Sequence, residues 1–142
     1  MQITQSTEYA VRCALHLALL PAGRVVPRRE IAGARAIPGP FLAKIAQRLA
    51  RAGLIRIHQG ARGGYELLVP ACRLTLLQVV EAAEGDLTLN TCVLHPRTCT
   101  RTRVCGAHRV WAEARTQLRA TLAGVTFAEL AAHEGPRHPK RK

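Results

Sequence analysis

Apolar residues recur at helical spacing in four stretches of the chain. The spacing i, i+3, i+4 and i+7 puts such residues on one face of a helix. It predicts a first helix from about Ser6 or Thr7 to Leu20, and a third helix that begins at Pro40 and stops before Gly53. The apolar faces are Val11, Ala14, Leu15 and Ala18; Leu42, Ile45, Ala46 and Leu49; Leu76, Val79, Val80 and Ala83; and Trp111, Ala114, Leu118 and Leu122.

The other stretches complete a mainly α-helical chain with one small β-hairpin. A short second helix follows Pro27. Residues 54–58 and 65–69 are rich in β-forming side chains and are separated by a glycine-rich turn, which predicts two paired strands. Capping boxes predict where the fourth and last helices begin; they are Thr75 with Gln78 and Thr126 with Glu129.

Three helices followed by a hairpin is the order of a winged helix-turn-helix DNA-binding domain. We therefore expect this domain over residues 1–85 and a cysteine-containing, cluster-binding loop over 86–105. A long dimerisation helix and a short C-terminal helix follow over 106–134, and residues 135–142 form a disordered basic tail without apolar periodicity. The long helix is amphipathic, so its apolar face can form a dimer seam or pack within the chain.

The distribution of charge indicates a polyanionic partner. The formal net charge is +12, and residues 24–62 contain nine Lys and Arg residues against the single acid Glu30. The third predicted helix is long enough to lie in the major groove of double-stranded DNA. The glycines of the turn between the two strands allow this turn to approach DNA closely, and Arg62 in the turn can enter the minor groove. The predicted DNA-binding residues are Arg28, Arg29, Pro40, Lys44, Gln47, Arg48, Arg51, His58, Arg62 and Gly63.

Three of the five cysteines and two of the six histidines lie within residues 92–108. Cys92, Cys99 and Cys105 are separated by six and five residues, and His108 follows three residues later. Thiolates are soft ligands, so this grouping indicates a metal or iron–sulfur site. Cys13 and Cys72 have no ligand spacing and are predicted to be packing residues.

The N-terminal residues lack a basic segment followed by an apolar stretch, and no apolar run is long enough to span a membrane. We therefore expect a cytoplasmic protein with no membrane partner. Cysteines stay reduced in that compartment, which favours a metal site over disulfides, in agreement with the odd cysteine count.

Several segments together resemble the Rrf-type family of winged-helix bacterial transcription regulators. They are residues 1–12, 41–55, 60–67 and 76–82, together with the three-cysteine loop, and the resemblance extends from residue 1 to about 132. It implies a homodimer that binds a double-stranded DNA operator, commonly as a repressor. An iron–sulfur cluster would adjust that binding in response to redox state, iron or nitric oxide.

In this resemblance, Cys92, Cys99 and Cys105 match the cluster cysteines of the family. His108 stands where IscR-like members have a histidine that completes a two-iron two-sulfur cluster. Glu8 stands where NsrR-like members use a carboxylate from the partner subunit. We favour His108 and a 2Fe–2S cluster, while the loop spacing also suits a 4Fe–4S cluster.

Two other functions fit parts of the sequence. Three thiolates and an imidazole also suit structural zinc, which would make the chain a DNA-binding protein without redox sensing. An electron-transfer module could use a cluster directly, although the basic hairpin would then have no role. The sequence contains no nucleotide-binding loop or serine nucleophile motif, so we expect no enzyme and no small-molecule substrate.

Overall fold

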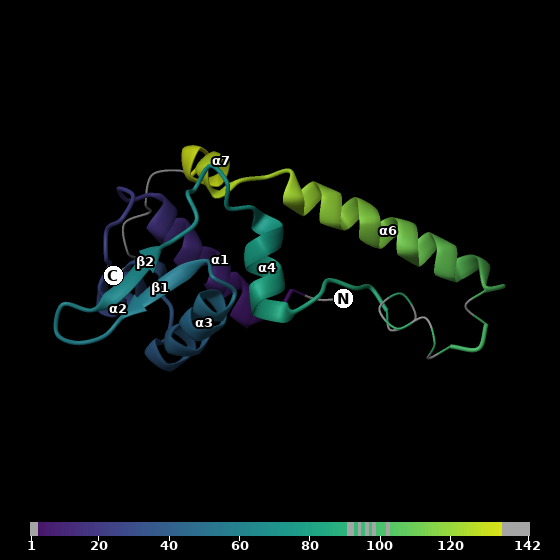
Figure 1. The fold of residues 1–142 in the computed structure, drawn as a ribbon, viewed down its shortest axis with the longest axis horizontal. Coiled ribbons are helices and arrows are strands. Elements are labelled where there is room, and N and C mark those ends of the chain that lie inside the picture. The colour runs from purple at the N-terminus through teal and green to yellow at the C-terminus, as the bar shows by residue number, and fades with distance from the viewer. Residues whose placement is uncertain are drawn as a thin grey trace, which may run out of the picture.

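The computed structural model describes residues 3–90, 93, 95, 97, 99–101 and 103–134 (Figure 1). Within them, three helices lead into a two-stranded antiparallel sheet, and three further helices follow. The elements are α1, Gln5–Ala18; α2, Arg28–Arg35; α3, Gly39–Arg51; β1, Ile55–His58; β2, Gly64–Leu67; α4, Leu76–Glu84; α6, Gly106–Ala123; and α7, Phe127–Ala132. The predicted helices and hairpin are all present, although the first helix ends at Ala18 rather than Leu20.

The main core lies where α1 packs against α3, α4 and α7. The α1 helix is capped by Thr4, whose hydroxyl accepts a hydrogen bond from the backbone N–H of Thr7 at 3.4 Å. Its inner face carries Ala10, Ala14 and Leu17, which are buried. Of the apolar face predicted for this helix only Ala14 is buried, while Val11, Leu15 and Ala18 are half-buried at the edge of the core. All four residues of the apolar face predicted for α3 are buried: Leu42, Ile45, Ala46 and Leu49.

Cys13 and Cys72 have different environments. Cys13 is fully buried within α1, which confirms that it is a packing residue. The same prediction is wrong for Cys72, which is exposed in the turn before α4. A cysteine in a short surface turn has no neighbouring layer to cover it, so its apolar character does not bury it.

The hairpin is held to the body of the protein by a third short segment. Residues Ile57 and Tyr65 are paired in the register of the two strands. Tyr65 also exchanges two backbone hydrogen bonds of 2.9 Å with Val26, which precedes α2. Gly64 makes this contact possible, because a Cβ atom there would lie 2.1 Å from the carbonyl oxygen of Val26. The hairpin therefore has a fixed orientation relative to α2.

Both predicted capping boxes are present, at the starts of α4 and α7. They lie side by side, because Thr75 and Thr126 form an isolated antiparallel bridge. The α7 helix returns to α1, where its first residue, Phe127, is buried in the main core. The end of the described chain thus packs against its beginning (Figure 1).

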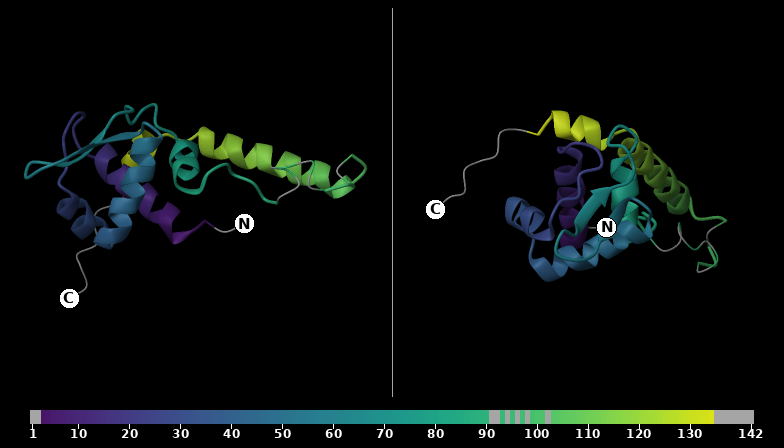
Figure 2. Two further views of the ribbon diagram at one scale, coloured as in Figure 1. Left: turned by 60° about the horizontal axis from the view of Figure 1, so that its bottom comes forward. Right: turned by 60° about the vertical axis from the view of Figure 1, so that its left-hand side comes forward.

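The long helix α6 extends away from the packed helices (Figures 1 and 2). Its second half packs within the chain, since Leu118 and Leu122 contact a small cluster of Leu77, Val80 and Leu87. Its first half leaves Val110 61% exposed and Trp111 45% exposed. One half of the predicted apolar face is therefore covered within the chain, and the other half is open.

In the part of the chain that the structure describes, no helix combines the length and apolar character needed to cross a membrane.

Candidate DNA interface and metal-ligand residues

The face of α3 that points away from the core is polar and basic. Lys44, Gln47 and Arg51 are exposed along it, at the helical spacing of i, i+3 and i+7. Pro40 is exposed at the start of the helix, where its fixed φ angle suits the first turn. Four predicted DNA-binding residues therefore share one solvent-facing side of α3.

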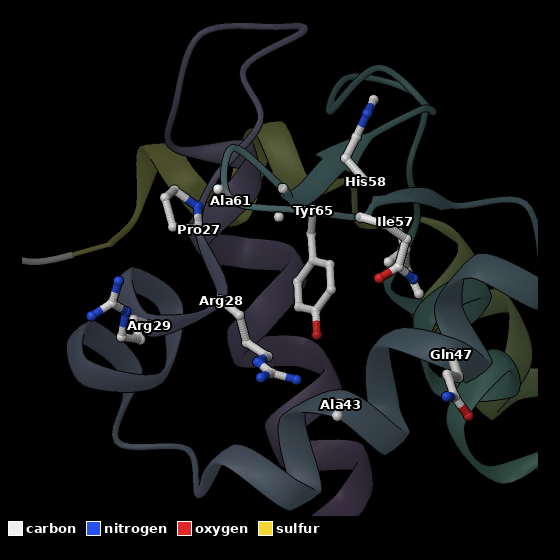
Figure 3. A pocket seen from close by; sticks show the side chains of 13 residues that line it. Pro27, Arg28, Arg29, Ala43, Gln47, Ile57, His58, Ala61 and Tyr65 are labelled. Carbon is white, nitrogen blue, oxygen red and sulfur yellow. The ribbon is translucent and has the colours of Figure 1, made fainter.

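A cleft of about 440 Å³ separates this helix from the hairpin and α2 (Figure 3). Five of the predicted DNA-binding residues line it, from three different elements: Arg28, Arg29, Gln47, His58 and Gly63. The other lining residues are Pro27, Ala43, Ile57, Gln59, Gly60, Ala61, Gly64 and Tyr65. The fold thus brings together side chains that the sequence separates by about thirty positions.

Tyr65 is one of the lining residues that were not predicted from the sequence. Figure 3 shows its ring standing in the cleft, with the hydroxyl directed towards α3 and the Arg28 side chain beside it. Burial raises the pKa of the Tyr65 hydroxyl, and the positive charge of Arg28 opposes that shift. An aromatic residue directly after a glycine pair, facing the same side as Ile57, is the sequence signal that could have indicated it.

The turn between the strands carries Arg62 at an exposed position. Gly63 closes this turn, with its backbone N–H donating to the carbonyl of Gly60 at 2.9 Å. A Cβ atom on Gly63 would lie 2.2 Å from the carbonyl oxygen of His58, so the tight turn requires glycine. The arginine is therefore presented at the tip of a narrow hairpin.

His58 has an acidic neighbour. Its Nε2 atom lies 2.7 Å from a carboxylate oxygen of Glu66 on the opposite strand. Both residues lie on the face of the hairpin opposite Ile57 and Tyr65, because side chains alternate along a strand. The imidazole of His58 accordingly points away from the centre of the cleft (Figure 3).

The nine basic residues between 24 and 62 fall into two groups. Three are bound to an acid or to a backbone carbonyl within the chain: Arg24 pairs with Glu30 at 3.3 Å, Arg35 pairs with Glu134 at 2.7 Å, and Arg48 donates to the Ala83 carbonyl at 2.8 Å. The other six are exposed on or beside the cleft, α3 or the hairpin; they are Arg28, Arg29, Lys44, Arg51, Arg56 and Arg62. The second group forms the basic surface of this domain.

Not all of the candidate metal ligands belong to the described residues. Cys92 lies outside them, as does the predicted basic tail, 135–142. Cys99 is exposed, and Cys105 is half-buried at the residue that precedes α6. His108 is half-buried in the first turn of α6, three residues after Cys105, so both lie on one side of that turn. Among the described residues alone, no group of three His, Cys, Asp or Glu side chains is arranged to hold a metal ion.

The donor set nevertheless fits an iron–sulfur cluster in its chemistry. Cys99, Cys105 and His108 offer two thiols and an imidazole within ten residues, and all three have solvent access. Glu8 is exposed in the first turn of α1. The start of α6 lies at the end of that helix that is farther from α1 (Figures 1 and 2).

An exposed basic helix beside a glycine-tipped hairpin defines a winged-helix DNA-binding regulator. The chain belongs to the Rrf2 family, whose model is described as an iron-dependent transcriptional regulator and matches residues 3–133. It is thus a transcription regulator of a DNA-binding family, not an enzyme. Because the match spans the helices and the hairpin alike, it confirms the predicted family and the predicted winged-helix fold.

Individual relatives agree with this assignment. The HTH-type transcriptional regulator NsrR of Halalkalibacterium halodurans is 31% identical over 135 residues, covering 94% of this chain and 92% of that protein. The structure of CymR, the global cysteine regulator of B. subtilis, is similar with a TM-score of 0.79 and 19% identity, covering 95% and 99% of the two chains. IscR of T. potens is similar with a TM-score of 0.73 and 20% identity, covering 94% and 88%. The two structures show that the fold is shared.

Proposed function

We propose that this chain is a homodimeric repressor that acts in the cytoplasm and binds a double-stranded DNA operator. In this proposal an iron–sulfur cluster senses redox state, iron or nitric oxide and modulates operator binding. The observation that carries the proposal is the single basic surface formed by α3, the start of α2 and the hairpin tip. Residues Cys92, Cys99 and Cys105 provide the sensing part.

Each part of the basic surface has a distinct role on DNA. Lys44, Gln47 and Arg51 follow one side of a helix that fits the major groove, so they would face base edges and flanking phosphates. Arg62 at the narrow hairpin tip would enter the adjacent minor groove. The phosphate strand between the two grooves would then cross the cleft, where Arg28 and Arg29 can neutralise it. Pro40, His58 and Gly63 would shape the two edges of this contact.

The exposed half of α6 supports the homodimer. Val104, Val110 and Trp111 are 79%, 61% and 45% exposed, and they lie before or within the part of α6 that extends from the body. Large apolar side chains that are exposed on a helix commonly mark a subunit interface. Two copies paired through this region would present two α3 helices to a two-fold symmetric operator.

The ligands in this proposal are Cys92, Cys99 and Cys105 with His108, and Glu8 of the partner subunit is the alternative to His108. A bound cluster, 2Fe–2S or 4Fe–4S, would supply an electron-accepting centre that is lost when iron is scarce or when oxidants attack it. Arg97, Arg101 and Arg103 are exposed between and beside the cysteines, where their charge suits an anionic donor set.

The regulatory step in this proposal is a change in the segment 86–105. When its cysteines are held together the segment is ordered, and when they are released it relaxes. This segment joins α4 to α6, so its order can change the tilt of α6 and α1 and hence the spacing of the two α3 helices in a dimer. Such a switch works only if DNA binding has different free energies in the two arrangements.

The DNA-binding part is tested with an operator selected from a pool of random duplexes by the purified protein. Metal-free and iron-loaded protein are then titrated against that operator at several salt concentrations. We expect operator binding that weakens steeply with salt and differs between the two forms. Equal affinity of the two forms at every salt concentration would contradict the switch while leaving DNA binding intact.

The metal part is tested by purification without oxygen, followed by measurement of iron, acid-labile sulfide, zinc and visible absorption. The native chain is compared with His108→Ala and Glu8→Ala. Stoichiometric iron and sulfide, with a spectrum altered by only one of the two substitutions, would establish the cluster and identify its fourth ligand. Zinc without sulfide would instead identify a structural metal site and remove the redox mechanism.

A further inference from the structure

The end of α4 is held by three other parts of the chain. We call residues 81–87, the last turn of α4 and the turn after it, the α4 junction. From α6, Arg115 donates to the Leu87 carbonyl at 2.6 Å and pairs with Asp86 at 2.9 Å. Arg119 also pairs with Asp86, at 3.2 Å, and with Glu81. The junction lies between α3 and α6 (Figure 1). Its last two residues are the first two of the segment 86–105, which we call the cysteine segment.

The start of α1 is attached to the same junction. The carboxylate of Glu84 accepts a hydrogen bond from the backbone N–H of Thr4 at 3.1 Å and further hydrogen bonds from the hydroxyls of Thr4 and Thr7. Desolvation raises the pKa of Glu84, but the hydrogen bonds from these threonines and the charge of Arg48 outweigh it, so the pKa lies below its ordinary value. Arg48 thus acts electrostatically on Glu84, which directly follows Ala83, the residue whose carbonyl accepts a hydrogen bond from Arg48.

The third attachment comes from α3 itself. Arg48 is half-buried and donates from Nη1 to the carbonyl of Ala83 at 2.8 Å. That carbonyl belongs to the last turn of α4, where backbone acceptors have no partner within the helix and where a positive charge is favourable. Lys44 and Arg51 differ from Arg48, because both are exposed on the outer side of α3. Among the basic residues of α3, Arg48 is therefore directed to α4 rather than to the outer surface.

We propose that Arg48 is a positioning residue that fixes the DNA-reading helix α3 against the α4 junction, so that displacement of the junction changes operator affinity. This assignment rests on the regulation proposed above and deepens it. In it, Arg48 contacts the end of α4 instead of a DNA phosphate. The junction is the point where α3, the start of α1 and α6 meet the beginning of the cysteine segment. Arg48 is the side chain that connects this point to α3.

The first test compares Arg48→Met with Arg51→Met in metal-free protein bound to its selected operator. Each lost phosphate contact reduces the magnitude of the slope of log affinity against log salt by about 0.9, so a substitution present in both subunits of a dimer reduces it by about 1.8. We expect that decrease for Arg51→Met, whereas Arg48→Met should weaken binding with the slope unchanged. A slope for Arg48→Met that falls as much as that of Arg51→Met would overturn the proposal.

The second test is a double-mutant cycle on operator affinity with Glu84→Gln. If Arg48 acts through the junction, the double variant Arg48→Met with Glu84→Gln should bind more tightly than the product of the single effects predicts, by roughly two-fold to a hundred-fold. Arg51→Met with Glu84→Gln is the matched control and should be additive. Additivity in both cycles would contradict the connection between Arg48 and the junction, and circular dichroism of each variant excludes unfolding as the cause.

These two tests use metal-free protein, so they do not depend on the cluster. The third measurement is the ratio of operator affinities of iron-loaded and metal-free protein, which should move towards one in Arg48→Met but not in Arg51→Met. A native ratio of one would reject the proposed switch, while the slope and the cycle would still decide the role of Arg48.

Discussion

At the scale of single residues, basic side chains that look alike in the sequence have different surroundings. Arg35 is only 11% exposed and pairs with Glu134, while its Nε donates to Nδ1 of the buried His16 at 3.2 Å. Arg51, on the outer side of α3, is exposed. A side chain already paired with a carboxylate would have to give up that pair to neutralise a phosphate. The effective charge that meets DNA is therefore smaller than the formal charge of the segment.

Two cysteines give a direct test of burial. Burial raises the pKa of the Cys13 thiol to about 12, so it stays protonated at neutral pH, whereas Cys72 is exposed. We expect iodoacetamide at mildly alkaline pH to modify Cys72 in the folded protein and to leave Cys13 intact until denaturant is added. Mass spectrometry of the peptides measures both, and equal labelling of the two thiols in the folded state would contradict the burial of Cys13.

Glu84 predicts a pH dependence of stability. Its pKa in the folded protein is lowered from the ordinary value of 4.5, so the unfolded chain binds a proton more readily. The resulting stabilisation is fully present above about pH 4.5 and is lost as the pH falls through the lowered pKa. Urea unfolding should show Glu84→Gln to be less stable than the native chain at neutral pH. The two free energies of unfolding should converge in acid, and a gap that is constant across pH would contradict an ionic role.

At the scale of elements, the hairpin depends on its attachment to the segment before α2. Gly64 has a φ angle of +154°, and its backbone lies against the carbonyl of Val26. The hairpin has only two strands, a size that is barely stable by itself in water. Its orientation towards the DNA therefore relies on the Val26 to Tyr65 bridge as well as on its own pairing.

Gly64→Ala should separate this bridge. The added Cβ atom has no space beside Val26, so we expect a loss of about 1–3 kcal/mol in the free energy of unfolding and weaker operator binding. Gly33→Ala in α2 is the control, because nothing lies within 4 Å of its Cβ position and alanine favours a helix. Urea denaturation measures both, and a Gly64→Ala protein as stable as Gly33→Ala would show that the bridge is dispensable.

At the scale of the whole molecule, the two halves of α6 have different surroundings. One half is packed on α4 by Leu118 and Leu122, and the other half carries exposed apolar residues. Such a projecting helix has too little contact with its own chain to bury Val110 and Trp111. Pairing with a second copy, as proposed above, would cover them.

Val110→Lys should weaken this pairing. A buried, unpaired ammonium group in a subunit interface is costly, so we expect the molar mass in solution to fall from that of two chains to the 15.5 kDa of one. Ala34→Lys adds the same charge to an exposed position of α2 and should leave the mass unchanged. Light scattering during gel filtration measures both, and an unchanged dimer in Val110→Lys would place the interface elsewhere.

Local signals in the sequence determined the order of helices and the hairpin. Apolar spacing, two capping boxes and a glycine-rich turn act over a few residues, so they predict the elements without knowledge of their neighbours. They also identified five of the residues that line the cleft, most of them by their charge or polarity, which is visible in the sequence. The first helix ends two residues before the predicted Leu20, at Ala18, because the exact end of a helix depends on its cap and surroundings and not on apolar spacing alone.

The tertiary structure decided which residues lie side by side and which residues of similar type are separated. It separated Arg48 from Lys44 and Arg51, placed Tyr65 beside Arg28, and divided α6 into a packed half and an open half. None of these distinctions follows from spacing, because each depends on an element that is distant in sequence. The sequence thus determined what each element is and what chemistry it carries, while contacts between distant elements decided which side chains remain available for DNA.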